Sequence, residues 1–132
     1  DAAGKDAKGQ TAASAVVMAQ TELAYYAGDD ALLLPLLAVG GVGVVGTSTH
    51  FTGARTVDCI DAYLAGDLEQ ALRIYRGLLP VYTGVFATQG VMLVKAGLNA
   101  RGHRVGPVRR PLLNATAAET ARFVALLDAA GL

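Results

Sequence analysis

The chain has 132 residues, of which 53% are apolar and 17% charged, and its 11 basic and 11 acidic side chains give a formal net charge of zero. This balance leaves no positive surface for nucleic acid or an anionic membrane, and the high apolar content excludes a disordered chain. The length suits one domain. Since roughly 25% charge is usual for such a domain, the composition predicts that the chain either packs against something else or is part of a larger core.

The single cysteine, Cys59, cannot form an internal disulfide, which favours a reducing, cytoplasmic compartment. The first residues lack the basic and apolar regions of a signal peptide. The span Ala31–Ala54 has no Asp, Glu, Lys or Arg and is long enough to cross a membrane, but Pro35 and several glycines interrupt it. Its pattern favours a helix, a strand and the start of another helix, so no membrane partner is expected.

The first half of the chain alternates between helix-forming segments and short apolar runs. Two apolar runs bounded by glycine predict buried strands, and the segments around them predict helices. In chain order these elements are a helix over 10–21, a strand over 23–27, a helix over 31–39 with a kink at Pro35, a strand over 42–47 and a helix capped at 47–49 that runs to Ala65. Buried strands separated by helices indicate a parallel sheet, and two strands are too few for it, so further strands are expected upstream.

The second half of the chain predicts helices alone. Asp67 caps a helix with an apolar stripe, which Pro80 bends or interrupts before the pattern resumes to about Ala87. Further helices are predicted over 92–100 and, after a loop with several prolines, from the capping box Thr116–Glu119 to Ala129.

One glycine pattern matches a nucleotide-binding motif only in its spacing. Gly41-x-Gly43-x-x-Gly46 has the dinucleotide spacing, but it lies in a predicted strand that follows a helix, whereas the motif requires a strand before it and a helix that opens inside it. Close packing of the backbone is therefore the favoured interpretation. His50 and His103 are far apart, and no Cys or carboxylate cluster has the spacing of metal ligands.

Cys59 lies between Asp58 and Asp61, whose charges would raise the thiol pKa, so it is not expected to act as a nucleophile. A cluster of basic residues is interpreted as a solvated stretch, with contacts to carboxylates or another subunit as the alternative. Its members are Arg101, Arg104, Arg109 and Arg110.

Lys5 precedes a turn and a predicted helix. A lysine at the carboxyl end of a parallel strand, in a dry site, can lose its proton near neutral pH and attack a ketone to form a Schiff base. Most lysines nevertheless lie exposed on the surface, and composition alone would place Lys5 among them.

Three segments in suitable order and spacing favour the catalytic interpretation: Lys5-Asp6-Ala7-Lys8-Gly9, Tyr26-Ala27-Gly28-Asp29-Asp30-Ala31 and Gly40-Gly41-Val42-Gly43-Val44-Val45-Gly46. Together they resemble the dihydrodipicolinate synthase family of pyruvate-dependent class I aldolases. Segments 65–67, 95–99 and 106–112 are similar to the C-terminal helices of that family, so the resemblance covers essentially the whole chain.

The resemblance implies an α/β fold, the C-terminal part of a (β/α)8 TIM barrel (about strands 6–8), followed by a C-terminal helical extension. Residues 1–65 would form the half-barrel βα units and residues 66–132 the extension. Lys5, on the sixth strand, would be the catalytic Schiff-base lysine. Gly28, at the end of the seventh strand, and Val45, on the eighth, would bind pyruvate.

The activity implied by the resemblance is that of a lyase that condenses pyruvate with aspartate semialdehyde through an imine on Lys5, in diaminopimelate and lysine biosynthesis. The imine serves as the electron sink, so no metal or external cofactor is expected. A homo-oligomer is also implied, and the chain alone would be weakly active because other site residues of the family lie in its N-terminal half. Two alternatives stay open: another pyruvate-dependent aldolase (a sialate or sugar-acid lyase), against which Gly28-Asp29-Asp30 argues, and a non-catalytic half-barrel scaffold.

Overall fold

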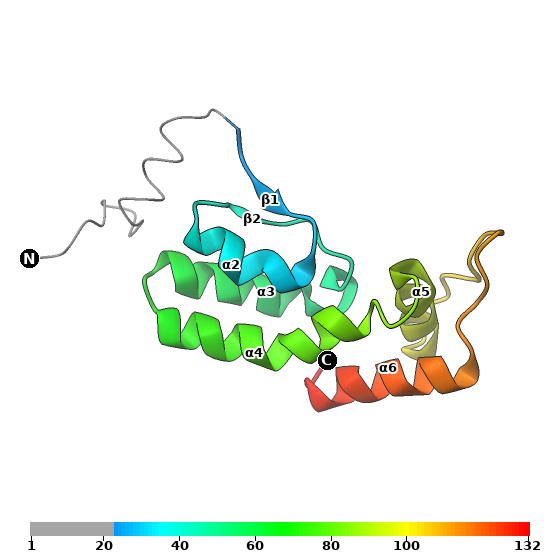
Figure 1. The fold of residues 1–132 in the computed structure, drawn as a ribbon. Coiled ribbons are helices and arrows are strands. Elements are labelled where there is room, and N and C mark those ends of the chain that lie inside the picture. Colours follow the sequence, from blue (N-terminus) through cyan, green and yellow to red (C-terminus); the bar gives the residue numbers. More distant parts are fainter. Residues whose placement is uncertain (1–22) are drawn as a thin grey trace, which may run out of the picture.

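The structure, a computed structural model, describes residues 23–132 (Figure 1). Its elements are β1 (Tyr26–Ala27), the 3-10 helix η1 (Asp30–Leu32), α2 (Leu33–Ala38), β2 (Gly43–Val44), α3 (Thr49–Leu64), α4 (Leu68–Gly84), α5 (Gly90–Ala100) and α6 (Ala117–Ala129). Lys5 and the helix predicted over 10–21 lie outside the described residues. Within residues 23–132, no helix is both long and apolar enough to cross a membrane.

The two strands form a parallel pair in which Tyr26 lies opposite Gly43 and Ala27 opposite Val44. Just outside the paired residues, Val42 N donates to Tyr25 O and Val45 N donates to Ala27 O, both at 2.8 Å. Parallel strands need a crossover connection, and here η1 and α2 supply it. Helix α2 packs against both strands (Figure 1), so the first described unit is a small βαβ arrangement.

The strands are shorter and less buried than their apolar composition predicts. Each has two residues, the Tyr26 residue is 56% exposed and the Val45 residue is 73% exposed, whereas Ala27 and Gly43 are buried. Strands do form within the predicted ranges 23–27 and 42–47, but the predicted lengths and the predicted burial of the whole segments are wrong. The physical reason is that, in the described part of the chain, the pair has no neighbouring strand on either edge. Strands of parallel sheets are apolar because other elements cover both faces of the sheet, and this pair of strands is covered only in part.

Two prolines disturb their helices less than the sequence predicts. Helix α2 begins at Leu33, so Pro35 lies in its first turn, where backbone N–H groups have no partner within the helix and the predicted kink has no cause. Helix α4 continues through Pro80 to Gly84, so the predicted interruption is wrong. Buried side chains on both sides of Pro80 hold α4 against its neighbours, and such packing outweighs local propensity.

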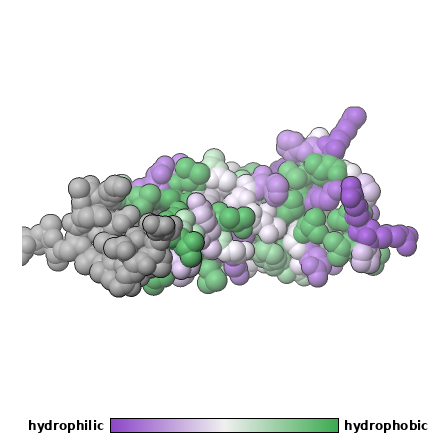
Figure 2. Space-filling view, turned by 90° about the horizontal axis from the view of Figure 1, so that it is seen from above, coloured by the Kyte–Doolittle hydropathy of each residue, from purple (hydrophilic) through white to green (hydrophobic). Residues whose placement is uncertain are grey.

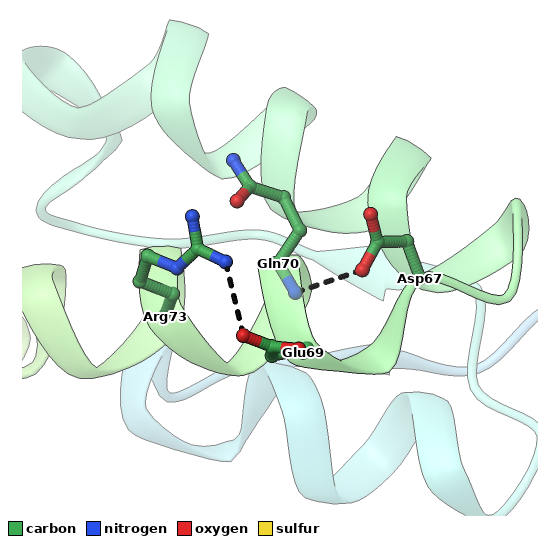
Figure 3. Close-up of polar contacts among 4 residues, drawn as sticks. All are labelled: Asp67, Glu69, Gln70 and Arg73. Atoms are coloured by element: carbon green, nitrogen blue, oxygen red, sulfur yellow. Dashed lines mark hydrogen bonds and ion pairs between the residues drawn. The ribbon is translucent and has the colours of Figure 1, made fainter.

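Helices α4 and α6 begin at the capping residues that the sequence predicts, whereas Ser48, the N-cap of α3 within the predicted 47–49, makes no side-chain capping bond. At the start of α4, the Asp67 side chain accepts a hydrogen bond from Gln70 N at 3.0 Å, and Arg73 pairs with Glu69 at 3.3 Å (Figure 3). The predicted capping box is also confirmed, because Thr116 accepts from Glu119 N and the Glu119 carboxylate accepts from Thr116 N. These bonds satisfy backbone groups that a helix start leaves without partners.

Two apolar clusters join the helices, and α4 contributes to both of them. The first cluster lies between α2, α3 and α4 and consists of Leu33, Leu37, Cys59, Ala71, Ile74, Leu78 and Tyr82. The second lies between the end of α4, α5 and α6 and consists of Val81, Val85, Leu93, Val94, Phe123 and Leu127. Figure 1 shows α3 and α4 side by side beneath the strands, with α6 along the other side of α4. Helix α4 thus connects the strand unit to the C-terminal helices.

Several large apolar side chains remain exposed on the described part of the chain. Some lie near the strands (Leu23, Tyr25, Tyr26, Leu32, Val39 and Val45), others along α3 and α4 (Val57, Leu64, Leu68 and Leu72). Figure 2 shows hydrophobic residues on the face seen from above, while polar side chains extend at the end where the loop after α5 lies. Open strand edges and exposed apolar side chains are features that promote association.

We predict that the isolated chain self-associates through the strand region. Light scattering should give a mass above that of the monomer, and a hydrophobic dye should fluoresce on binding. Tyr25→Lys, at a side chain 44% exposed beside the strands, should weaken both signals, whereas Val105→Lys, at a 38% exposed residue in the loop after α5, should change neither. A monodisperse monomer that binds no dye would contradict this prediction.

Candidate active site at the strand ends

The carboxyl ends of β1 and β2 form the candidate site. Because the strands are parallel and Ala27 pairs with Val44, Gly28, which follows β1, and Val45, which follows β2, lie at the same edge. Both residues are exposed, and a Cβ added at Gly28 would meet no atom within 4 Å. The described part of the chain therefore brings together two of the three predicted site residues, at an edge with accessible backbone. The third, Lys5, lies outside the described residues.

Asp30 ties the two strand ends together from below the surface. The residue is only 1% exposed, and its Oδ2 accepts a hydrogen bond from Thr47 N at 3.0 Å. Its Oδ1 accepts from Ser48 N at 3.1 Å and from Ser48 Oγ at 2.5 Å. Both amides belong to the loop that joins β2 to α3. A carboxylate after β1 therefore holds the segment after β2, and it also lies at the positive end of α3.

A chain of buried hydroxyl groups extends from Asp30 across α3 to α4. Ser48 Oγ lies 3.2 Å from Thr52 Oγ1, Thr56 Oγ1 donates to Thr52 Oγ1 at 3.2 Å, and the Tyr82 hydroxyl lies 3.1 Å from Thr56 Oγ1. We call Ser48, Thr52, Thr56 and Tyr82 the hydroxyl ladder. All four are buried, and each hydroxyl group has a partner, as buried polar groups require.

Two tyrosines of this region, Tyr75 and Tyr82, have raised pKa values and act as hydrogen-bond donors. Burial raises the pKa of Tyr82 to about 12, although its hydrogen bond with Thr56 opposes the increase. Burial, and to a smaller extent the charge of Asp29, also raises the pKa of Tyr75, whose hydroxyl donates to Ala31 O at 2.6 Å. Both phenols therefore keep their protons at neutral pH, and Tyr75 links α4 to η1 while Tyr82 links α4 to α3.

The glycines of the nucleotide-like spacing serve close packing of the backbone. Gly41 follows α2, and a Cβ there would overlap the Leu36 side chain and come within 2.9 Å of Leu36 O. A Cβ on Gly46 would overlap the Asp30 carboxylate. No helix begins inside the motif, since α3 starts at Thr49, after the last glycine. The interpretation as packing glycines is favoured over a dinucleotide site by this geometry.

Other candidate residues are structural or exposed. The pKa of the Cys59 thiol is raised, as predicted, but the main cause is its burial and not the adjacent acids. Within residues 23–132, no cluster of three His, Cys, Asp or Glu side chains could hold a metal ion. Of the predicted basic cluster, Arg101 pairs with Asp128 at 2.6 Å and donates to Leu132 O at 2.6 Å, which fastens the end of α5 to α6.

The structure reveals two features of the candidate site that sequence reasoning missed. Asp30, just before the helix predicted over 31–39, is buried and joins both strand ends, whereas Asp29 caps η1 by accepting from Ala31 N at 2.9 Å. The hydroxyl ladder has a visible signal in the i, i+4, i+8 spacing of Ser48, Thr52 and Thr56, which places them on one face of a helix. Hydroxyl-bearing residues at that spacing indicate a buried polar stripe only once the facing helix is known.

The model of one protein family, described as the dihydrodipicolinate synthetase family, matches residues 2–130. The chain belongs to the dihydrodipicolinate synthetase family. Curated relatives named 4-hydroxy-tetrahydrodipicolinate synthase, from Cutibacterium acnes and Acidothermus cellulolyticus, are each 56% identical to it, over 124 and 127 residues. The matches cover 94% and 96% of this chain but 42% and 41% of the relatives, so the chain spans less than half the length of these family members.

Solved structures of the dihydrodipicolinate synthetase family share the fold. The enzyme from Cyanidioschyzon merolae, solved with lysine bound, superposes with a TM-score of 0.82 at 36% identity, over 97% of this chain and 44% of that chain. A dihydrodipicolinate synthase from Bacillus anthracis gives a TM-score of 0.79 at 31% identity, over 87% of this chain and 40% of that chain. The described residues are thus a helix-rich α/β part of a TIM-barrel family, and the resemblance stated from the sequence is confirmed.

In this family member, we predict that Gly46→Ala destabilises the fold by about 1–3 kcal/mol, because its Cβ would displace the buried Asp30 carboxylate. Gly53→Ala is the matched control. A Cβ at Gly53, within α3, would meet no atom within 4 Å, so the free energy of unfolding should rise by up to about 1 kcal/mol. Urea denaturation of both variants measures the difference, and equal stabilities would contradict the close packing at Gly46.

We also predict a loss of stability in alkali that depends on Tyr82. An unfolded tyrosine loses its proton near pH 10, whereas Tyr82 keeps its proton to about pH 12 in the folded state. The folded state therefore binds more protons between these values, so this contribution to the unfolding free energy is fully present below pH 10 and is lost as the pH rises towards 12.

Denaturation measured on either side of pH 10 should show a smaller alkaline loss in Tyr82→Phe than in the unchanged chain. At neutral pH the same variant should lose about 1 kcal/mol, because Thr56 loses its donor. The exposed Tyr25→Phe should retain the full alkaline loss. An unchanged alkaline loss in Tyr82→Phe would show that another group is responsible.

Proposed function

We propose that the chain is the C-terminal part of a 4-hydroxy-tetrahydrodipicolinate synthase, which condenses pyruvate with aspartate semialdehyde. The observation that carries the proposal is that two parallel strands end side by side, next to exposed Gly28 and Val45, in a chain of the dihydrodipicolinate synthetase family. In TIM barrels, active sites lie at the carboxyl ends of the strands. The identity of 56% to two curated synthases supports this reaction over others.

In the proposed barrel, Lys5 lies on the sixth strand, β1 is the seventh and β2 the eighth. Consecutive strands of such a barrel are parallel neighbours joined by a helical crossover, and β1 and β2 have this relation. The helical extension begins at residue 66, in the turn between α3 and α4, where Gly66 has a φ of 82°. Residues 1–65 then supply the barrel part and residues 66–132 the extension.

The proposed reaction begins at the amine of Lys5. The amine attacks the ketone carbon of pyruvate, water leaves, and a protonated imine forms. Loss of a proton from the pyruvate methyl group gives an enamine, whose terminal carbon attacks the aldehyde carbon of aspartate semialdehyde while the aldehyde oxygen takes up a proton. The imine nitrogen accepts the electron pair, so the new carbon–carbon bond needs no metal or external cofactor.

The backbones of Gly28 and Val45 hold the pyruvate part of the imine in this proposal. The Val45 amide already donates to Ala27 O, which leaves its carbonyl oxygen for the substrate. At Gly28 the absence of a side chain keeps the backbone open to a ligand, since no atom lies within 4 Å of a Cβ added there. Small substrates of this kind are held by a few backbone and polar groups at a concave site.

The cellular setting follows from the proposed reaction. The product leads to diaminopimelate and lysine, which places the protein among biosynthetic enzymes of the cytoplasm, and the exposed apolar side chains along α3 and α4 are available for a homo-oligomer. Gly28-Asp29-Asp30 favours the synthase over sialate or sugar-acid lyases. A non-catalytic scaffold differs from both enzymes in that its Lys5 would form no imine.

We predict that Lys5 is trapped by pyruvate and borohydride. The decisive sample is a chimera in which this chain replaces the matching 42% of the Cutibacterium acnes synthase, because the chimera supplies the remaining barrel. Peptide mass analysis should find one reduced pyruvate on Lys5. Lys5→Arg should abolish both the adduct and the condensation, whereas Lys8→Arg, three positions away, should keep both.

A folded chimera without an adduct on Lys5 would contradict the proposal and favour the scaffold. If the adduct forms, turnover with aspartate semialdehyde but not with sugar aldehydes would support the synthase over the lyases. The opposite preference would assign the chain to a sugar-acid or sialate lyase.

A further inference from the structure

Hydrogen bonds hold each residue of the segment between β2 and α3, although its first residue, Val45, is exposed. Val45 N donates to Ala27 O at 2.8 Å, Thr49 Oγ1 donates to Gly46 O at 2.6 Å, and the amides of Thr47 and Ser48 both donate to Asp30. The Val45 residue nevertheless remains 73% exposed at the strand ends. A rigid backbone that presents an open surface is what a binding site needs, because little entropy is then lost when a ligand binds.

A carboxylate suits the Asp30 position better than any other side chain of its size. Its three partners, the two amides and the Ser48 hydroxyl, all donate, and they occupy both of its oxygens. An asparagine would place an NH₂ group where one oxygen now accepts, so two donors would face each other in a buried place. Gly46 is part of the same fit, since a Cβ there would occupy the space of the carboxylate.

The hydroxyl ladder fixes the direction of these bonds. Ser48 donates its only hydroxyl proton to Asp30, so Thr52 must donate to Ser48. Thr56 donates to Thr52, which leaves Tyr82 as the donor to Thr56. Burial holds the pKa of Tyr82 at about 12, so this donor stays protonated.

Both ends of the hydroxyl ladder are closed to solvent, because Ser48 is 0% and Tyr82 is 1% exposed, and Asp30 next to Ser48 is 1% exposed. The ladder is therefore suited to hold Asp30 in place rather than to move protons. Its hydrogen bonds connect the carboxylate through α3 to α4, the helix that both apolar clusters share. Networks in which every buried group is satisfied make a region rigid.

We propose that Asp30 is a positioning residue for the strand-end site, where it holds the backbone of Val45 in the place from which it contacts pyruvate. The inference rests on the proposed function for the identity of the ligand. The positioning itself is a property of the hydrogen bonds among Asp30, Thr47 and Ser48. These two parts have separate readouts, one in amide exchange and one in pyruvate binding.

The first measurement is hydrogen exchange of the Thr47 and Ser48 amides in Asp30→Asn and in the unchanged chain. Exchange should be about tenfold faster in the variant, because one amide loses its acceptor. Asp67→Asn is the matched control, since asparagine is an equally good helix cap at the exposed start of α4 (Figure 3) and should leave both rates unchanged. Unchanged exchange in Asp30→Asn would overturn the inference.

The second measurement uses the chimera and separates positioning from a general loss of structure. In Asp30→Asn, the pyruvate concentration for half-maximal trapping on Lys5 should rise by about tenfold or more, while the KM for aspartate semialdehyde stays within about twofold. A merely structural role would lower the amount of active protein and leave both concentration dependences unchanged, and that result would overturn the inference.

Ser48→Ala guards against failure of the first variant to fold. It removes the hydroxyl bond to Asp30 but keeps both amide bonds, so its pyruvate dependence should shift less than that of Asp30→Asn, and in the same direction. A chimera that forms no imine with any Asp30 side chain would reject the proposed function, while amide exchange would still decide whether Asp30 holds the loop.

Discussion

The buried carboxylate of Asp30 is the constraint on which the strand-end region depends. A polar group with 1% exposure is stable in a fold only when its hydrogen bonds are complete. Asp30 follows β1 in the chain, and all of its side-chain hydrogen bonds come from Thr47 and Ser48, in the segment after β2. The two strands have only two residues each, so the backbone hydrogen bonds between them are too few to fix their ends. Asp30 supplies the missing connection, and Gly46 provides the space for it.

The hydroxyl ladder extends this constraint into the helical part of the chain. Ser48, Thr52 and Thr56 occupy the face of α3 that meets Tyr82 on α4, where apolar side chains would bury more hydrophobic surface. A line of hydroxyl groups is instead directional, because each has one proton to donate, and it therefore specifies one alignment of α3 against α4. Leu78 and Tyr82 join this polar line to the first apolar cluster, so helix packing and the geometry of the strand ends are set together.

Local signals in the sequence predict most of the helices, because their causes lie within a few residues. Asp67 and the Thr116–Glu119 capping box mark the starts of α4 and α6. A few short motifs in the sequence also predict the protein family, and the match of the family model over residues 2–130 confirms that prediction. The extent of the strands, the continuation of α4 through Pro80 and the role of Asp30 follow from partners distant in sequence. Ser48 lies 18 positions from Asp30, and Tyr82 lies 26 from Thr56.

The low charge of the chain has a physical reason in this arrangement. Tyr26 and Val45 are large apolar residues of the kind that fill a barrel interior. In the structure they are nevertheless 56% and 73% exposed. The match covers about 42% of the length of the first curated relative, and in this TIM-barrel family such side chains belong to a barrel that the described residues form only in part. Within the described residues, Asp30 and the hydroxyl ladder are buried although the sheet has only two strands there. The hydrogen bonds that orient the strand ends are therefore complete within the described residues, whereas the apolar side chains of the strand region remain exposed there.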